Sequence, residues 1–600
     1  MERRQLEGQG DRGLRAAGDC SHTGSPTYRK KGRTMRRQFF ALLSVVAAIL
    51  LAAGSGSLAR GSNSGDKEGH DDFESGSALV VPSNDSSASN GAAGKKGPQV
   101  GPNVRVNAAQ VLPGAGLLGR SETTIAADAT GLDLVAGFND AQGFCGRPFG
   151  AACTPQSPSG LSGYAFSTDG GATWTDGNAP PNFNNVFTRG DPWMARGGLD
   201  GNTFFYANLA VDATTGADLG VSVHRGHFNG SSFAWEDVHV FNAPNAPNDF
   251  YDKEAIAIDK QDQGLGIVSL TNFVKACGVA QNGDGQIEVW RTADGGTTWH
   301  GPTIVSPDQT NPACDGTGTL QQSSAPAITP KGDAYVAWQF GPTFTATGTS
   351  TNAEIRLAHS SDGGATFGTP VTVAAINSMR QDPPVGYTRD RINDHPRVAV
   401  ATSGPHKGRV FVSFYSAVAP VTAAALTPCP PPNVGATCRA QNLTSSQVFL
   451  TFSDDKGQTW STPTPLAPAP PPTGIKRLWP VVTVGNSDNV DVVYNESQET
   501  ATGTTSDCNV SLGGGRRRRG PAHSFVNTFM VHSSDGGATF GSPVQVSSAT
   551  SDWCTAQVNI RPNFGDYIGS AAEEGTVFPV WGDSRNGPVD TFFAPVALDN

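Results

Sequence analysis

Short runs of alternating hydrophobic and polar residues recur along the chain from about residue 120 to its end. Runs of about five residues in which every second side chain is apolar are typical of half-buried β-strands. They lie at 134–138, 334–338, 410–414, 490–494 and 577–581. A second kind of strand-like run precedes them and recurs along the chain. Its copies lie at 122–126, 191–195, 252–258, 324–328, 394–399, 479–482 and 566–571. The pattern therefore predicts repeated pairs of strands and argues against a helical bundle.

A second repeat supplies the turns between strands. Five segments follow the pattern Ser/Thr-x-Asp-x-Gly-x-Thr-Trp/Phe, and we call them the repeat turns. They are 167–174, 292–299, 360–367, 453–460 and 533–540. Glycine supplies a positive φ, the aspartate accepts backbone N–H bonds across the turn, and the aromatic ring packs beneath it. We therefore interpret these aspartates as braces of β-hairpin tips and not as catalysts.

The spacing of the first strands defines the modules. They start near 122, 191, 251, 324, 393, 478 and 566. Four-stranded sheets repeated radially form a β-propeller. We predict an all-β protein with a single propeller of seven blades, with six as the alternative if one module is an insertion. The last module lacks a repeat turn, and Val104–Asn107 from the amino-terminal side is predicted to add its fourth strand and close the ring.

Composition agrees with a turn-rich β protein. The chain of 600 residues contains 73 Gly and 42 Pro, and only 16% of its residues are charged, against about 25% in an average soluble chain. Its 30 Phe and 10 Trp allow a substantial core, so disorder of the whole chain is excluded.

The amino-terminal part is predicted to be an export segment. Met35-Arg36-Arg37 precedes an apolar run from Phe39 to Ala53, and small residues follow, which is the order of a secretory signal peptide. We expect translation to begin at Met35, which would make residues 1–34 an untranslated leader, 35–59 the signal peptide, 60–100 a flexible linker, and 101–600 the propeller. An uncleaved anchor is the alternative, but the run is shorter than the roughly 20 residues of a comfortable membrane span.

Charge and cysteines fit an exported protein. The net charge is −11 and becomes more negative once the basic leader is removed, so a general nucleic-acid binder is not expected. The one basic cluster, Arg516–Arg519, is predicted in a loop that is solvated or cleaved, with polyanion binding as the alternative. Outside the leader the cysteines are even in number, so disulfides are expected, although sequence leaves their pairing open. They form close sequential pairs, namely Cys145 with Cys153, Cys277 with Cys314, Cys429 with Cys438, and Cys508 with Cys554.

The repeat turns have the form of the Asp box, also called the bacterial neuraminidase repeat. The chain from about 101 to 600 thus resembles the sialidase-like β-propeller superfamily. The resemblance implies a propeller and, in the sialidases, an arginine triad that holds the substrate carboxylate, a Tyr/Glu pair at the anomeric centre and an Asp as acid/base.

Candidate site residues stand where the first strands begin, because those strands line the axis of a propeller. Asp191, Asp394 and Asp566 are the catalytic candidates, together with Asp252 and Glu254 as further carboxylates and Tyr567 as a nucleophile. Substrate-binding candidates are Arg189, Arg391 and Arg561 at these entrances and Arg585 at the end of a second strand, because guanidinium groups bind carboxylates in a bidentate way. Arg389 and Arg477 stand at equivalent entrances. The alternative is that these Asp and Arg residues form ion pairs between blades.

We therefore expect a secreted sialidase-like glycoside hydrolase that acts on terminal acidic sugars of glycans. The alternative is a non-catalytic secreted propeller that binds glycan, protein or cell-wall polymer. No cofactor or metal is demanded by the sequence, with calcium left open. The expected partner is a glycan or cell-surface polymer, without nucleic acid or stable membrane insertion, and the protein is expected to be a monomer.

Overall fold

The computed structural model describes most of the chain after residue 96. It covers residues 97–110, 118–141, 161–215, 217–243, 249–261, 264–274, 285–306, 318–345, 348–350, 352–387, 389, 391–421, 426–428, 437–439, 444–485, 488–500, 509–512, 516–519, 523–556, 558, 560 and 562–598. The predicted leader, signal peptide and nearly all of the linker lie outside these residues.

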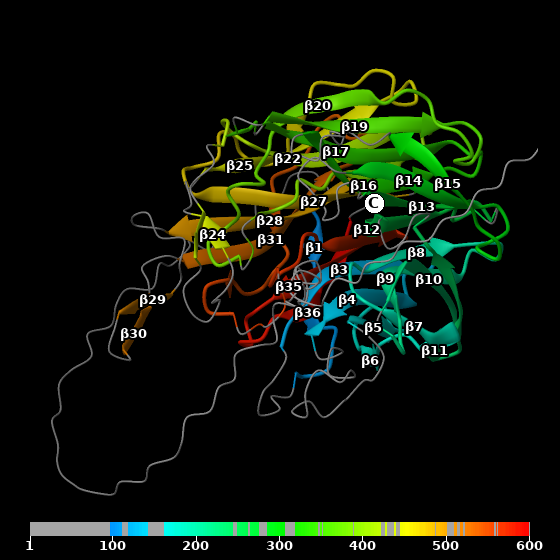
Figure 1. Cartoon of the computed structure of the whole chain (residues 1–600), viewed down its shortest axis with the longest axis horizontal. Coiled ribbons are helices and arrows are strands. Elements are labelled where there is room, and N and C mark those ends of the chain that lie inside the picture. Colours follow the sequence, from blue (N-terminus) through cyan, green and yellow to red (C-terminus); the bar gives the residue numbers. More distant parts are fainter. Residues whose placement is uncertain are drawn as a thin grey trace, which may run out of the picture. The chain divides into compact units, whose positions relative to one another are not determined.

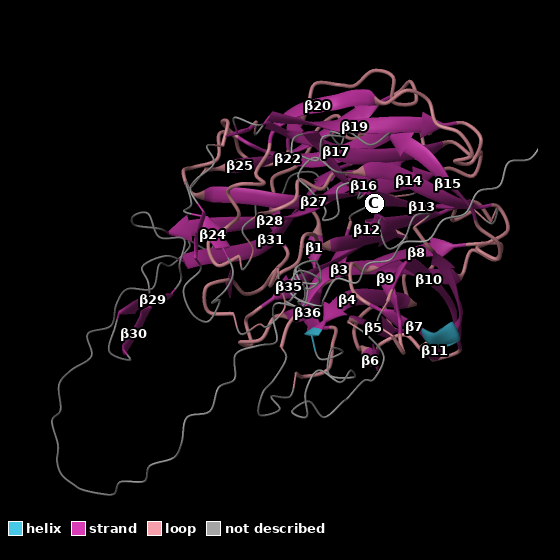
Figure 2. Ribbon diagram, in the orientation of Figure 1, coloured by secondary structure: helices cyan, strands magenta, loops and turns pink. Residues whose placement is uncertain are grey.

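The protein is an all-β propeller with almost no helix in its described part (Figure 1, Figure 2). One 3-10 turn, η4, lies at Phe183–Asn185. The first two sheets contain β3 (Arg120–Ala127), β4 (Leu134–Asp140), β5 (Ser162–Ser167) and β6 (Thr175–Asn178), then β7 (Val186–Thr188), β8 (Trp193–Gly197), β9 (Thr203–Asp212), β10 (Asp218–Asn229) and β11 (Ser232–Phe241). The next two contain β12 (Asp249–Ile258), β13 (Gly266–Val274), β14 (Gln286–Thr292) and β15 (His300–Ser306), then β16 (Gly318–Ile328), β17 (Ala334–Thr345), β18 (Gly348–Thr349), β19 (Asn352–Ser360) and β20 (Val371–Asn377).

The remaining strands form a nine-stranded sheet, the last sheet of the ring and two small hairpins. The nine-stranded sheet contains β21 (Arg397–Val400), β22 (Val410–Ala417), β25 (Ser446–Ser453), β26 (Thr464–Pro465), β27 (Ile475–Val484), β28 (Val490–Thr500), β31 (His523–Ser533), β32 (Val544–Gln545) and β33 (Ser551–Asp552). The last sheet contains β34 (Gly569–Glu573), β35 (Thr576–Asp583), β36 (Asp590–Phe593) and β37 (Val596–Ala597), joined by β1 (Gln99–Val100) and β2 (Val104–Arg105). The hairpins are β23 (Leu426–Pro428) with β24 (Thr437–Arg439), and β29 (Asn509–Leu512) with β30 (Arg516–Arg519).

The strands predicted from alternation are confirmed. The run 134–138 lies in β4, and the runs 334–338 and 410–414 lie in β17 and β22. β4 and β22 are buried along their whole length, since both of their faces are covered by neighbouring sheets. Five sheets of four to six strands are separate blades. β2 pairs with β36, so the segment near Val104 does join the last sheet.

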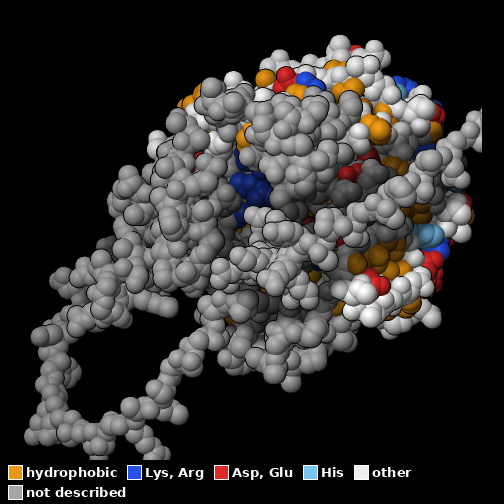
Figure 3. All heavy atoms as spheres, in the orientation of Figure 1, with side chains coloured by type: hydrophobic (Ala, Val, Ile, Leu, Met, Phe, Trp, Pro, Cys, Tyr) orange, Lys and Arg blue, Asp and Glu red, His pale blue; other side chains and the backbone are white. Residues whose placement is uncertain are grey.

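The prediction that Arg516–Arg519 lies in a loop is wrong. These residues form β30, which pairs antiparallel with β29. Val510 and Leu512 give β29 the β-favouring residues that such a pair requires. On the face drawn in Figure 3, acidic and basic side chains of the described residues lie interspersed.

The core lies between neighbouring sheets. Phe205 on β9 packs with Ile256 on β12 in one buried cluster. Phe138 on β4 packs in another cluster with Phe578 on β35 and Phe593 on β36. The first and last sheets therefore share a core although more than 400 residues separate them in sequence.

The repeat turns have the internal bonds that the sequence predicts. Asp169 accepts bonds from the Ser167 hydroxyl (2.8 Å) and from the Thr173 backbone N–H (2.9 Å) and hydroxyl (2.6 Å). The Trp174 indole N–H donates to the Gly171 carbonyl at 3.1 Å. The aspartates of the other four turns, at 294, 362, 455 and 535, make the same three bonds. These aspartates brace turns, as expected.

Four of the repeat turns also pack against the sheet before through the glycine that stands two residues after the aspartate. At Gly296, whose φ is +79°, a Cβ would lie 2.5 Å from the Phe205 ring, on the sheet before. Gly171 lies in the same way against Phe593, so the first sheet is packed on the last. A side chain at these positions would meet both backbone strain and a steric clash.

Gly296→Ala is expected to destabilise the protein by about 1–3 kcal/mol more than Gly363→Ala. Gly363 has a similar φ of +73°, but a Cβ there would meet no atom within 4 Å. The two variants share the cost of a left-handed alanine and differ in the clash with Phe205. Urea unfolding of both would measure the difference, and equal free energies of unfolding would contradict the packing role.

Candidate functional site at the propeller axis

A non-glycine residue in the left-handed region stands within or just before several first strands. The φ values are 53° at Glu122, 55° at Asp191, 54° at Lys253, 62° at Ser323 and 55° at Trp479. β3, β12, β16 and β27 also shift register at this point. Such strain costs about 1–3 kcal/mol per residue and, like β-bulges, is concentrated at functional sites, where it re-aims side chains. A left-handed residue thus recurs at equivalent places in different sheets.

Three of these side chains meet in a buried ion-pair cluster. The Lys253 Nζ lies 2.6 Å from Asp191 Oδ2, 3.0 Å from Asp566 Oδ2 and 3.8 Å from Glu122 Oε1. Asn139 donates from Nδ2 to Glu122 Oε2 at 2.8 Å, and the other carboxylate oxygen of Glu122 accepts the Asp566 backbone N–H. We call Glu122, Asp191, Lys253 and Asp566 the axial cluster.

A loop before β21 completes the surroundings of Asp566. Arg389 NH1 lies 2.7 Å from Asp566 Oδ2, and Asn393 Nδ2 donates to the same oxygen at 3.0 Å. The Tyr387 hydroxyl donates to Asp566 Oδ1 at 2.8 Å. Asp566 is fully buried, and its two oxygens are held by four side chains from two parts of the chain, β12 and the loop before β21.

The charges of the axial cluster separate into ionised and protonated groups. Although burial acts in the opposite direction, Lys253 lowers the pKa of Asp191, and Arg389 with Lys253 holds the pKa of Asp566 well below its usual range. Burial, followed by the neighbouring Asp191 carboxylate, raises the pKa of Glu122 well above its usual range. The surroundings therefore push the pKa values of these carboxyl groups in opposite directions.

Two further acids flank Asp191. Burial, with the nearby Asp191 carboxylate, raises the pKa of Asp252 to about 7, although Lys253 acts against this shift. Asp252 remains partly exposed, so this proton can exchange with solvent. Glu254 is 2% exposed, and burial followed by Asp191 raises its pKa well above the usual range. Asp191, whose pKa is lowered, thus lies among carboxyl groups whose pKa values are raised.

Tyr567 is a neutral phenol in this arrangement. Its hydroxyl donates to the Pro192 carbonyl at 2.9 Å, and burial, then Glu122, raises its pKa well above the usual range. The Arg397 guanidinium lies 5.2 Å from the centre of the Tyr567 ring and 4.1 Å from that of Trp193. No acidic partner of Arg397 is found within the described part of the chain, and burial lowers its pKa to about 9.

Asp394 lies in a separate network. Its Oδ1 accepts the Met379 backbone N–H at 2.9 Å, its Oδ2 accepts from Gln339 Nε2 at 3.0 Å, and the Ser378 hydroxyl also donates to it. Burial raises its pKa to about 6. The adjacent Asn393 links this network to the axial cluster, so the structure brings together Asp191 and Asp566 but holds Asp394 beside a loop.

The predicted arginines are spread over different surroundings. Arg189 is half-buried, and its side chain has no ion-pair partner among the residues described. Arg585 lies away from the axial cluster and pairs with Asp583 at 2.6 Å, over the ring of Phe592. Arg391 is half-buried, and Arg561 lies outside the described residues. Arg477 pairs with Glu496 at 2.7 Å within its own sheet.

The structure tests the predicted disulfides at one cysteine. Cys554 is disulfide-bonded. The other cysteines of the predicted pairs lie outside the residues whose side chains are described, so their pairing stays a prediction. They are Cys145, Cys153, Cys277, Cys314, Cys429, Cys438 and Cys508.

The described residues contain no candidate metal-binding group and no candidate membrane-spanning helix. Within the described ranges no group of three or more His, Cys, Asp or Glu side chains could hold a metal. In the same ranges, no helix is long and apolar enough to cross a membrane.

Sequence reasoning missed the cation at the centre of the cluster. Arg389 was among the arginines predicted at these entrances, whereas in the sequence Lys253 and Glu122 stand out only as parts of first strands. The common signal was available, because each stands at the same point of its module as Asp191. Their alignment in space required the left-handed residue and the register shift that only the structure displays.

No protein-family model and no curated protein sequence matches the chain. One similar solved structure is a Hadza microbial sialidase, with 14% identity over 67% of this chain and 64% of that chain and a TM-score of 0.36. Another is Penicillium chrysogenum alpha-L-arabinanase, with 13% identity over 67% of this chain and 94% of that chain and a TM-score of 0.37. A third is phage phi92 endosialidase, with 10% identity over 84% of this chain and 70% of that chain and a TM-score of 0.38. The chain spans less than two thirds of the Hadza microbial sialidase. Sialidases are thus among the structures that it resembles, and we draw no conclusion about activity from likenesses of this degree.

Proposed function

We propose that this protein is a secreted glycoside hydrolase of the sialidase type, with the axial cluster as its active site. The observation that carries the proposal is the position of Asp191. Lys253 lowers its pKa, and it lies beside Glu122 and Asp252, whose pKa values are raised. A pair of carboxyl groups with pKa values pushed apart by their surroundings is the arrangement that glycoside hydrolysis requires.

The two roles fall to different residues. Asp252, with a pKa of about 7 and access to solvent, is the general acid that protonates the leaving-group oxygen. Asp191 is the carboxylate that stabilises the positive charge developing at the anomeric carbon or activates the attacking water. Lys253 and Arg389 are positioning residues, because they hold Asp191 and Asp566 ionised and in place.

Two arginines support a terminal acidic sugar as substrate. Arg189 directly precedes the Gly190–Asp191 entrance, and Arg397 lies against Tyr567, next to Asp566. Neither has an acidic partner among the residues that the structure describes. A guanidinium without a counter-ion is suited to bind the carboxylate of a sugar acid in a bidentate way.

The second candidate function is non-catalytic binding of a glycan or cell-surface polymer. One observation favours it, namely that the ion pairs of the axial cluster connect different sheets. Lys253 on β12 pairs with Asp191 before β8 and with Asp566 before β34. Such pairs can brace neighbouring blades without taking part in a reaction.

Turnover of a fluorogenic sialoside between pH 4 and 8, with and without calcium, tests the two functions. The hydrolase is expected to release the fluorophore with an alkaline limb near pH 7, set by Asp252. Absence of turnover at every pH, together with binding on a glycan array, would reject the hydrolase and support the second candidate.

We further propose a ring of seven blades. The first strands β3, β8, β12, β16, β21, β27 and β34 each contact the next, and β34 contacts β3. The two halves of the nine-stranded sheet are joined by a single parallel pair, Ser446 with Lys476, which supports dividing that sheet into two blades. Pairing of β2 with β36 supports closure by the amino-terminal strand. An experimental structure with six radial sheets would contradict the count.

A further inference from the structure

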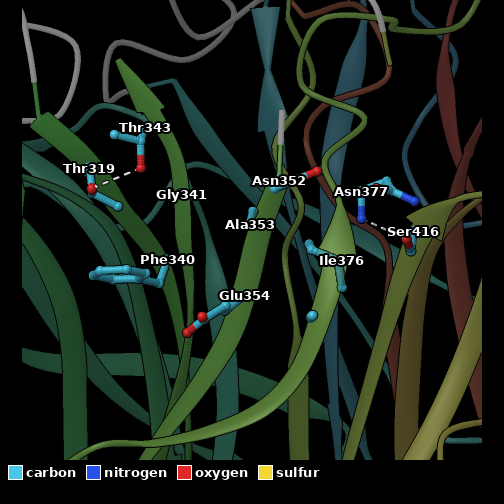
Figure 4. A pocket seen from close by; sticks show the side chains of 11 residues that line it. Thr319, Phe340, Gly341, Thr343, Asn352, Ala353, Glu354, Ile376, Asn377 and Ser416 are labelled. Atoms are coloured by element: carbon cyan, nitrogen blue, oxygen red, sulfur yellow. Dashed lines mark hydrogen bonds between the residues drawn. The ribbon is translucent and has the colours of Figure 1, made fainter. Parts of the chain in front are cut away.

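A polar cleft of about 470 Å³ opens between two sheets, and no residue of the axial cluster lines it. Strands β16, β17, β19 and β20 form most of it, and Ser416 on β22 closes it from the next sheet. Figure 4 shows Thr319 and Thr343 on one side, Asn377 and Ser416 on the other, and Asn352, Ala353 and Glu354 between them. We call this the Phe340 cleft, after the one aromatic ring that lines it.

The walls of the Phe340 cleft are held rigid. The Asn377 backbone N–H donates to the Ser416 hydroxyl at 2.9 Å and ties β20 to β22. Glu354 Oε2 accepts from Arg356 Nε and from the Thr372 hydroxyl, both at 2.9 Å. The Arg356 guanidinium lies 3.3 Å from the centre of the Phe340 ring and so covers one of its faces. Preorganised polar walls lower the cost of ordering a bound ligand.

Hydrogen-bonding capacity nevertheless remains inside the cleft. The Thr319 and Thr343 hydroxyls bond each other at 3.0 Å, which leaves one donor and several acceptor positions on the pair. The side-chain amide of Asn352 is exposed and makes no hydrogen bond within the described part of the chain. Together with the second oxygen of Glu354, these groups offer both donors and acceptors next to a phenyl ring. This combination is suited to a ligand rich in hydroxyl groups.

Charge separates this cleft from a second one of similar size. The Phe340 cleft is lined by no Lys or Arg of the described chain, and its one charged lining residue is Glu354. A cleft of about 480 Å³ near Trp174 is instead lined by Arg105 and Arg585. The Glu354 charge is paired with the Arg356 guanidinium at 2.9 Å, so the cleft offers an acidic sugar no unpaired cation and favours an uncharged ligand.

The Phe340 cleft also lies next to the network that leads to the axial cluster. Ser378 follows Asn377 of the cleft, and Gln339 precedes Phe340, and both donate to Asp394. The adjacent Asn393 donates to Asp566 of the axial cluster. A chain-like ligand bound in the cleft would therefore lie on the side of the sheets where the first strands begin.

We propose that the Phe340 cleft binds uncharged sugar units of a glycan chain, as a site separate from the axial cluster. The ligand class rests on the proposed function, but the binding does not require hydrolysis. Asn352, Thr343 and Thr319 would bond sugar hydroxyls, and Phe340 would contact the apolar face of a sugar ring.

Binding of three neutral hexasaccharides, cellohexaose, β-1,4-galactohexaose and chitohexaose, tests the proposal by saturation-transfer-difference NMR titration. The full chain is expected to bind at least one of them with a Kd below about 1 mM. Asn352→Ala and Thr343→Val are each expected to weaken that binding by about five- to tenfold, because each removes a hydrogen-bonding group. Asn352 is exposed, so its substitution leaves the fold intact.

The control is Asn586→Ala, which removes an amide from the second cleft and is expected to leave the Kd unchanged. Absence of binding of all three sugars at about 5 mM, or equal Kd values for the Asn352 and Thr343 variants and the wild type, would overturn the proposal. Measurement in an Asp191→Asn background separates the two proposals. Retained binding without hydrolysis in the wild type would refute the enzyme alone, and hydrolysis of a small sialoside without hexasaccharide binding would refute the cleft alone.

Discussion

Lys253→Met is expected to lower the free energy of unfolding by about 3–5 kcal/mol at pH 7. Methionine keeps the length and apolar stem of lysine but leaves Asp191 and Asp566 as buried carboxylates without the ammonium that lies 2.6 and 3.0 Å away. The side chain of Lys253 is only 6% exposed, so solvent cannot replace the lost charge. Urea unfolding of the variant and the wild type measures the effect.

The matched control is Lys260→Met. Lys260 also pairs with a carboxylate, that of Glu573, but its side chain is 49% exposed. Solvent screening limits exposed pairs to about 0–1 kcal/mol. A loss at Lys253 no larger than that at Lys260 would contradict the central role of the buried cation.

The deficit of Lys253→Met is expected to shrink in acid. Asp191 and Asp566 have lowered pKa values in the folded protein, so the stability they contribute is present above their unfolded pKa of about 3.9 and is lost as pH falls through the folded values. Protonation also removes the uncompensated charges in the variant. Free energies of unfolding measured from pH 7 down to pH 3 should therefore converge, and a deficit that grows in acid would contradict this electrostatic account.

Asp191→Asn is expected to lower kcat for a fluorogenic sialoside by about 10²–10⁴-fold. The amide retains the shape of the side chain but not the carboxylate that the proposed reaction uses. The substitution also removes a negative neighbour that raises the pKa of Asp252. The alkaline limb of the remaining activity should therefore move to lower pH, which a pH profile of kcat measures and a merely structural role would not produce.

Asp491→Asn controls for the loss of a buried carboxylate. Asp491 is fully buried and bonds His532 at 2.8 Å, outside the axial cluster. Its substitution is expected to alter stability but neither kcat nor the pH profile. Equal effects of the two substitutions on kcat would show that Asp191 acts through the fold alone.

The sequence by itself determined the architecture, because its signals are local. Alternation marked β4, β17 and β22, and the repeat turns carried their own hydrogen bonds within eight residues, as at Ser167–Trp174. Asp191 and Asp566 could be singled out because both stand where a first strand begins. A local pattern needs no knowledge of distant contacts.

Only the tertiary structure decided which of these residues meet. Lys253 lies on one sheet, and Asp191 and Asp566 precede strands of two others, and the left-handed backbone at Asp191 and Lys253 directs those two side chains toward each other. By contrast, Asp394, at an equivalent entrance, is used to hold a neighbouring loop. The difference depends on side-chain directions and burial across sheets hundreds of residues apart, and the pKa values that separate acid from carboxylate follow from that burial.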